Sequence, residues 1–156
     1  MRVLESRELE GLQHIIDRAA EMAQASPCQK SQRGAVVFIN NKILGTGYNE
    51  PPYPFECDGA FCRPICSQFA IHAEQNAIYN TLKGYKLKDL QQASIFHIKV
   101  EKGVRLPSND LSCAECSKLV LKLGLKEFIL FQDRGYVAYD TIEFHKLTLE
   151  YLKSKI

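Results

Sequence analysis

An amphipathic pattern opens the chain. Between residues 6 and 22, apolar side chains recur three or four positions apart, at Leu9, Leu12, Ile16, Ala19 and Met22. This spacing places them on one face of a helix. Ser6 stands where an N-cap residue is expected, and Pro27 marks the end of the helix or the loop beyond it.

Short β-branched runs and further helical patterns follow. Residues 34–39 (GAVVFI) and 43–48 (ILGTGY) flank a polar triplet, which predicts a β-hairpin. Residues 93–100 and 127–131 have the pattern of strands. Helices are predicted at 68–82, at 113–123 with Gly124 as the stop, and from 140 onward, where Asp140 and Glu143 have capping-box spacing.

The order of these elements predicts an α/β fold. A strand, a helix and a strand between 93 and 131 fit a right-handed crossover that joins parallel strands. We therefore expect three layers, α-β-α, with a mixed sheet that has helices on both faces. A chain of 156 residues favours a single domain, 1–156. The proline-rich stretch 49–67 is a long loop, and such loops usually carry a function or are clamped.

Composition narrows the class of protein. The chain is 46% hydrophobic and 24% charged, and its net charge is +2, which is ordinary for a soluble globular protein. Such a charge is too mild to indicate nucleic-acid or membrane binding. The charged N-terminal stretch does not resemble a signal peptide, and no apolar run approaches the ~20 residues that span a bilayer. We expect a cytoplasmic protein.

Six cysteines then become informative, since clustered cysteines in a reducing compartment are more often metal ligands or catalytic groups than disulfides. They are Cys28, Cys57, Cys62, Cys66, Cys113 and Cys116. The first four lie in or near the proline-rich loop. They could hold a second, structural metal, or they could be ordinary reduced thiols.

Cys113 and Cys116 stand at a predicted helix start, three residues apart, so both sulfurs face one side. A helix N-terminus also favours thiolates. His72 and Glu74 are two residues apart, which allows a joint site only where their helix begins. One imidazole and two thiolates would leave a tetrahedral zinc with an open position, as in catalytic sites. Taken alone, the cysteines could equally be buried thiols.

Two motifs, HAEQNAI (72–78) and CAEC (113–116), resemble the cytidine and deoxycytidylate deaminase superfamily. The signature of zinc-dependent base deaminases is H-x-E followed by P-C-x-x-C. Residues 28–49, which end in GYN, are similar to the segment that precedes these motifs in the family, and the cysteine-bearing loop looks like the deoxycytidylate branch. The resemblance covers about residues 10–131. It implies a cytidine-deaminase-like fold, a catalytic Zn²⁺ and hydrolytic deamination of a cytosine nucleotide, with dCMP to dUMP favoured.

The resemblance also implies residue roles. The zinc ligands would be His72, Cys113 and Cys116. Glu74 would take a proton from the zinc-bound water and protonate N3 of cytosine, hydroxide would attack C4, and Glu74 would then protonate the departing amino group. For substrate binding, the N–H of Ala73 would face the ring, Asn49 would hydrogen-bond the sugar and Tyr136 would line the pocket. Without the family context, Asn49 is simply a turn residue.

Two positions depart from the family pattern. Ser112 replaces the proline before the first cysteine, and Glu50 replaces a glycine after GYN, where its charge would repel a 5′-phosphate. The substrate could therefore be a nucleoside, another base or a polynucleotide, although the weak net charge disfavours the last. Candidates for holding a phosphate are Arg63, Arg105 and Arg134.

A non-catalytic zinc-binding module is the alternative from outside the enzyme class. Glu74 argues against it, because a structural zinc has no use for a carboxylate beside an open coordination position. By analogy with the family, we expect a homo-oligomer that acts on a small pyrimidine nucleotide or nucleoside.

Overall fold

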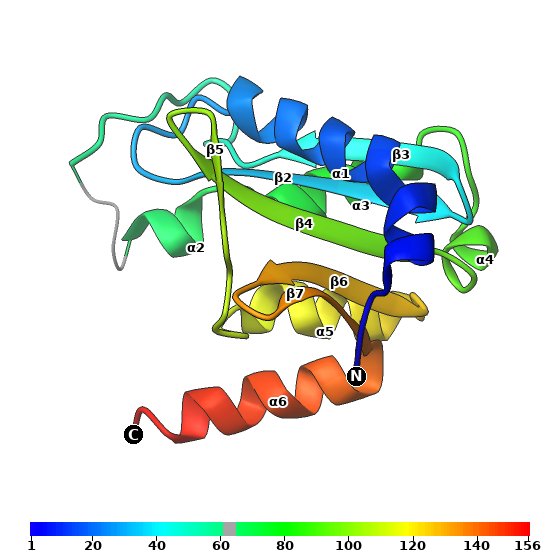
Figure 1. Ribbon diagram of the computed structural model, residues 1–156. Helices are drawn as coiled ribbons and strands as arrows, with labels where there is room; N and C mark the ends of the chain where they lie inside the picture. Colours follow the sequence, from blue (N-terminus) through cyan, green and yellow to red (C-terminus); the bar gives the residue numbers. More distant parts are fainter. Residues whose placement is uncertain (61–64) are drawn as a thin grey trace.

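The computed structural model describes residues 1–60 and 65–156, and it shows one mixed β-sheet between layers of helices (Figure 1). The elements in chain order are β1 (Arg2–Val3), α1 (Ser6–Ala25), β2 (Gln32–Ile39), β3 (Lys42–Tyr48), α2 (Ser67–Phe69), α3 (Ala73–Thr81), α4 (Leu87–Leu90), β4 (Ser94–Glu101), β5 (Val104–Leu106), α5 (Ala114–Leu123), β6 (Glu127–Gln132), β7 (Gly135–Asp140) and α6 (Thr141–Lys153). The strands follow one another in the order β1-β7-β6-β4-β2-β3, and β5 pairs with β4.

The predicted hairpin and crossover are confirmed. Strands β2 and β3 pair antiparallel. Strands β4 and β6 pair parallel, from Ser94 opposite Glu127 to His97 opposite Leu130, and α5 lies between them in the chain. Three strands were not predicted: β1, β5 and β7. Strand β7 follows β6 after a turn at Asp133 and Arg134, and it begins at Gly135, whose φ is 120°.

Two details of the predicted helices are wrong. Helix α1 has Glu5 as its N-cap, with no side-chain cap, and Ser6 is its first residue. The single helix predicted at 68–82 is broken. The backbones of Glu50 and Ile71 exchange two hydrogen bonds of 3.0 and 2.7 Å, so Ile71 is held extended. Helix α2 therefore ends at Phe69, and His72 becomes the N-cap of the new helix α3.

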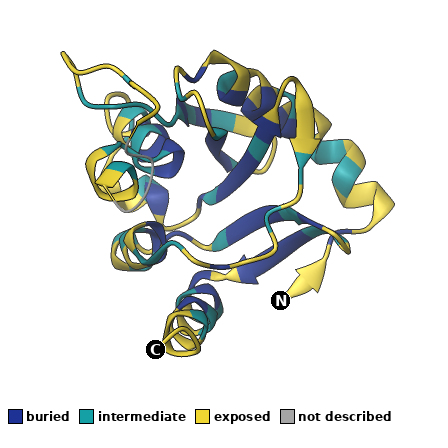
Figure 2. Cartoon of the chain, turned by 90° about the vertical axis from the view of Figure 1, so that its left-hand side faces the viewer, coloured by how far each residue is buried: buried dark blue, intermediate teal, exposed yellow. Residues whose placement is uncertain are grey.

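The two faces of the sheet carry separate apolar clusters. One cluster joins Ile15 and Ala19 of α1 to Val36, Phe96 and Ile98 of the sheet. The other lies on the opposite face and includes residues of α3, α5 and α6, such as Ala77, Val120 and Phe144, with Ala35, Val37 and Ile95 of the sheet. Buried residues run along the strands between the helical layers (Figure 2). The predicted three-layer fold is confirmed, with α1 on one face and α3, α5 and α6 on the other.

Helix α3 lies unusually close to β3 because two glycines leave room for its backbone. A Cβ on Gly47 would collide with Ala77 N and would lie 2.7 Å from Ala73 O, and a Cβ on Gly45 would lie 2.6 Å from Thr81 N. Real Cβ atoms do not tolerate such contacts with backbone. The two glycines therefore set how closely the helix that begins at His72 approaches the sheet.

No helix in the described part of the chain is long and apolar enough to cross a membrane.

We expect Gly47→Ala to lower the free energy of unfolding by about 1–3 kcal/mol, because the added methyl must push α3 away from β3. Chemical denaturation followed by circular dichroism measures this loss. Gly84→Ala is the matched control, since a Cβ there meets nothing within 4 Å. Equal stability of Gly47→Ala and Gly84→Ala would show that the close approach does not constrain α3.

Candidate active site

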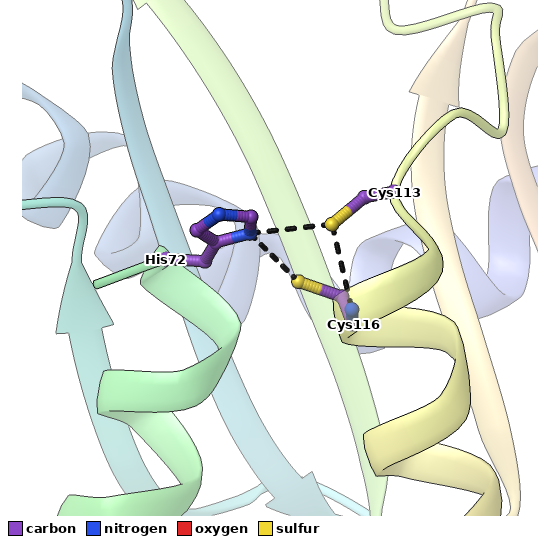
Figure 3. A group of neighbouring side chains, drawn as sticks. All are labelled: His72, Cys113 and Cys116. Atoms are coloured by element: carbon purple, nitrogen blue, oxygen red, sulfur yellow. Dashed lines mark hydrogen bonds between the residues drawn. The ribbon is translucent and has the colours of Figure 1, made fainter. Parts of the chain in front are cut away.

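Two helix starts bring one imidazole and two sulfurs together. His72 is the N-cap of α3, Cys113 is the N-cap of α5, and Cys116 lies in the first turn of α5. The Nδ1 atom of His72 is 3.2 Å from Cys113 Sγ and 3.3 Å from Cys116 Sγ. Figure 3 shows the three side chains converging, with β4 passing behind them.

The His72 ring is oriented by a backbone carbonyl. Its Nε2 lies 2.9 Å from the oxygen of Ser67. A carbonyl can only accept, so Nε2 carries a proton and donates it. In the neutral ring, the lone pair is then on Nδ1, which faces the two sulfurs. Metal-binding histidines are commonly oriented in this way through the second ring nitrogen.

The start of α3 is fastened on both sides. The backbone N–H of His72 donates to Gln75 Oε1 at 2.8 Å, as part of a capping box. Asn76 Nδ2 donates to the carbonyl of Tyr48, at the end of β3, at 2.8 Å. These bonds and the close packing of α3 on β3 hold the His72 side chain in place.

The three groups perturb each other's protonation. Hydrogen bonding with Cys116, followed by that with His72, lowers the pKa of Cys113 to about 5. Hydrogen bonding with Cys113 raises the pKa of His72 to about 9, although burial acts in the opposite direction. The pKa of the buried Cys116 thiol is raised, first by its hydrogen bond with Cys113. Cys113 is thus a thiolate at neutral pH.

The donor set fits zinc. The three ligand atoms lie within 4.8 Å of one another. Zinc–nitrogen and zinc–sulfur bonds of roughly 2.0–2.3 Å in a tetrahedron separate ligand atoms by about 3.5–3.8 Å. The two nitrogen–sulfur distances, 3.2 and 3.3 Å, are slightly shorter, so a small outward shift of these side chains would admit the ion. Nitrogen with two sulfurs is also the ligand chemistry that zinc prefers.

Glu74 lies beside this cluster in the first turn of α3, and only 7% of it is exposed. Burial raises its pKa, while positive charge on His97 and on His72 and a hydrogen bond from Cys116 lower it, and the net shift is downward. Burial lowers the pKa of His97 to about 4. His97 is therefore neutral at pH 7, and the positive charge that keeps Glu74 ionised there comes from the side of His72.

Comparison with known proteins agrees with this geometry. Residues 9–132 match the family model of the cytidine and deoxycytidylate deaminase zinc-binding region. The chain belongs to this deaminase family. Mouse deoxycytidylate deaminase is 29% identical over 164 residues, which cover 93% of this chain and 84% of the relative.

Two solved structures show the same fold. The dCMP deaminase of cyanophage S-TIM5, in complex with dCMP and dUMP, is 25% identical with a TM-score of 0.56, over 80% of this chain and 81% of that one. Cytidine deaminase from Burkholderia pseudomallei is 15% identical with a TM-score of 0.59, over 85% and 94% of the two chains. The second likeness is one of fold alone.

The other predicted substrate residues of this deaminase domain are placed differently. Ala73 begins α3 next to His72. The amide of Asn49 holds the loop before β2: Oδ1 accepts from Ser26 Oγ at 2.7 Å and from the N–H of Arg33 at 2.8 Å, and Nδ2 donates to Ser31 O at 2.7 Å. Tyr136 packs on Phe96 and Phe131, on the α1 face of the sheet. The structure therefore does not bring Tyr136 to the cluster.

The loop cysteines do not form a comparable group in the described residues. Cys28, Cys57 and Cys66 are half-buried, and His72, Cys113 and Cys116 form the one candidate metal group found there. Cys62 lies outside the described residues.

Two of the arginines that were suggested to hold a phosphate bind other side chains of the protein. Arg105 pairs with Asp17 at 2.8 Å, and Arg134 donates to Tyr139 Oη at 3.0 Å. Arg63 lies outside the described residues.

Sequence reasoning missed three polar residues on the face of the sheet that carries the site: Arg33, His97 and Lys99. His97 and Lys99 continue the alternation of the buried Ile95 along β4, and Arg33 is two residues before Ala35 on β2. Arg33 Nη1 lies 3.4 Å from His97 Nε2. His97 Nδ1 is buried with no hydrogen-bond partner among the described residues. The alternation along β4 could have placed His97 and Lys99 on the same face as Ile95. Polar residues in a predicted strand are usually assigned to the solvent-facing side, however.

His97 makes the stability of the protein sensitive to acid. Its pKa in the folded state, about 4, lies below the ordinary 6.5. As the pH falls below about 6.5, the unfolded chain therefore takes up a proton that the folded chain refuses. We expect the free energy of unfolding to decrease between pH 6.5 and pH 4 by up to about 3 kcal/mol from this residue.

Denaturation of wild-type and His97→Gln proteins at half-unit pH steps tests this. The two stability curves should run parallel above pH 6.5, and the variant should lose less stability below it. Parallel curves throughout would show that burial of neutral His97 does not matter for acid sensitivity.

Proposed function

We propose that this protein is a zinc-dependent hydrolytic deaminase that converts dCMP to dUMP and releases ammonia. The observation that carries the proposal is the buried Glu74 carboxylate beside a site of one imidazole and two sulfurs. Three protein ligands leave a tetrahedral zinc one open position for water, and a carboxylate that is not a ligand but lies nearby can take a proton from that water.

His72, Cys113 and Cys116 would hold the ion. A zinc ion bound in this way lowers the pKa of its water to about 7 and so supplies a nucleophile at neutral pH. The carbonyl of Ser67 keeps His72 Nδ1 directed at the two sulfurs, where the ion would bind. The thiolate state of Cys113 prepares the site for a cation.

Glu74 moves the protons. Its carboxylate accepts a proton from the attacking water and passes it to N3 of the cytosine, while the oxygen adds to C4. It then carries the second proton of the water to the exocyclic amino group, which leaves as ammonia. Burial suits Glu74 to this shuttle, because a carboxylate with little solvation holds and releases a proton at low cost of reorganisation.

The substrate assignment follows from relatives and from the site. The mouse relative is a deoxycytidylate deaminase, and the cyanophage relative binds dCMP and dUMP. We propose that the N–H of Ala73 contacts the ring. Asn49 would bind the sugar through the second hydrogen of Nδ2, since its oxygen already accepts from Ser26 and Arg33.

We also propose a domain organisation, a cellular compartment and an oligomeric state. The two clusters on opposite faces share one sheet, which supports a single domain over 1–156. Unprotected thiol ligands suit the reducing cytoplasm. A homo-oligomer is proposed by analogy with the family and awaits a measurement of mass in solution.

Replacing Glu74 by glutamine should abolish turnover and preserve zinc binding. The amide cannot accept the proton, so we expect kcat for dCMP to fall by about 10²–10⁴-fold, with zinc content and the circular dichroism spectrum unchanged. Glu115→Gln is the control, because Glu115 is exposed in the first turn of α5 and pairs with Lys118. Full activity in Glu74→Gln protein would refute the shuttle.

Zinc should bind at one equivalent per chain through the proposed ligands. Cys113→Ser protein should lose the metal and its activity, because a neutral hydroxyl replaces a thiolate. Cys57→Ser protein should keep both. Elemental analysis of protein purified without chelators measures the stoichiometry. A second equivalent that disappears in Cys57→Ser protein would establish a further site in the cysteine-bearing loop.

A further inference from the structure

Two cations stand opposite each other on the face of the sheet that carries the candidate site. Arg33 of β2 and Lys99 of β4 are direct antiparallel partners. Their places in the alternation, two residues from Ala35 and four from Ile95, put both side chains on the face covered by α3 and α5. Like charges directly opposite each other destabilise a sheet. Such a pair needs a compensating negative charge.

None of the described carboxylates forms a direct ion pair with either cation. No carboxylate in the described residues lies within 4.0 Å of Arg33 or Lys99, whereas Arg105 pairs with Asp17 and Arg2 with Glu8 and Glu127. Arg33 bonds to neutral groups, Ser31 Oγ at 3.1 Å and His97 Nε2 at 3.4 Å. Both cations are half-buried, so they lose hydration without gaining an ion-pair partner among the described residues.

The position of the pair relates it to the substrate. The backbone N–H of Arg33 donates to the Asn49 side chain, which we assign to the sugar. His97, whose Nε2 lies 3.4 Å from Arg33 Nη1, is within electrostatic range of Glu74, Arg33, His72 and Lys99. The buried Nδ1 of His97 has no partner among the described residues, which is a second group left unsatisfied in the same place.

We propose that Arg33 and Lys99 bind the 5′-phosphate of the substrate nucleotide. This inference rests on the proposed function, and it makes the pair the determinant that selects a nucleoside monophosphate over a nucleoside. A guanidinium and an ammonium are the usual partners of phosphate oxygens. Bound phosphate also supplies the missing countercharge.

Glu50 does not cancel this charge. The sequence pattern suggested that Glu50 would repel a phosphate. In the structure, its Oε1 accepts from Asn76 Nδ2 at 3.3 Å, and its backbone pairs with Ile71. Glu50 is thus engaged with the start of α3, and it makes no ion pair with Arg33 or Lys99 in the part of the chain that the structure describes.

Steady-state kinetics with dCMP and with deoxycytidine test the proposal. We expect Arg33→Gln and Lys99→Gln each to lower kcat/KM for dCMP by about 10- to 100-fold, mainly through KM. Activity on deoxycytidine should change less than about threefold. Lys88→Gln, an exposed change on α4, removes the same charge elsewhere and should leave both substrates unaffected. Equal losses on both substrates, or unchanged dCMP kinetics, would overturn the phosphate assignment.

Calorimetric binding of dUMP and deoxyuridine separates this inference from the proposed function. Wild-type protein should bind dUMP at least about tenfold more tightly than deoxyuridine, and Arg33→Gln and Lys99→Gln should reduce this preference. If neither cytosine compound is deaminated, the proposed function fails, but a charge-dependent preference for dUMP would still support the phosphate site. Turnover of deoxycytidine with no preference for dUMP would keep the deaminase and refute the site.

Discussion

The structure depends on two helices that begin at the same place on one face of the sheet. His72 reaches the sulfurs because α3 starts there, and α3 starts there because the Glu50–Ile71 backbone pair ends the preceding segment as an extended chain. The glycines of β3 then allow the helix to lie close to the sheet. Helix α5 is placed independently by its crossover between β4 and β6. The metal group is therefore a product of packing over several elements.

Burial sets the charge states of the ionisable groups in the site. Glu74 is nearly inaccessible to solvent, so its charge state is set by neighbouring charges. Burial also keeps His97 neutral, which leaves His72 as the positively charged neighbour of the carboxylate at neutral pH. A site of this kind has a small reorganisation cost when protons move, and enzymes gain much of their rate from such arrangements.

Three polar residues of β2 and β4 lie on the face of the sheet that carries the site. Arg33, His97 and Lys99 occupy positions that alternate with buried apolar residues on β2 and β4, where an ordinary core would have further apolar side chains. An arrangement that costs stability without a countercharge is most easily understood where a ligand supplies one. Family membership explains the metal group, and Arg33 and Lys99 are the residues that we propose bind the phosphate of the substrate.

The sequence by itself determined the alternation of strands and helices, the three-layer fold and the family. These depend on local periodicity, on caps such as Asp140 and Gly124, and on two short motifs, each of which is contiguous in the sequence. It also pointed to His72, Glu74, Cys113 and Cys116 as one group. The break before His72, the strand β7, and the places of Tyr136 and of the Arg33–Lys99 pair were decided by tertiary structure. They depend on which strands pair and which face each residue takes, and pairing between distant segments leaves no mark in local spacing.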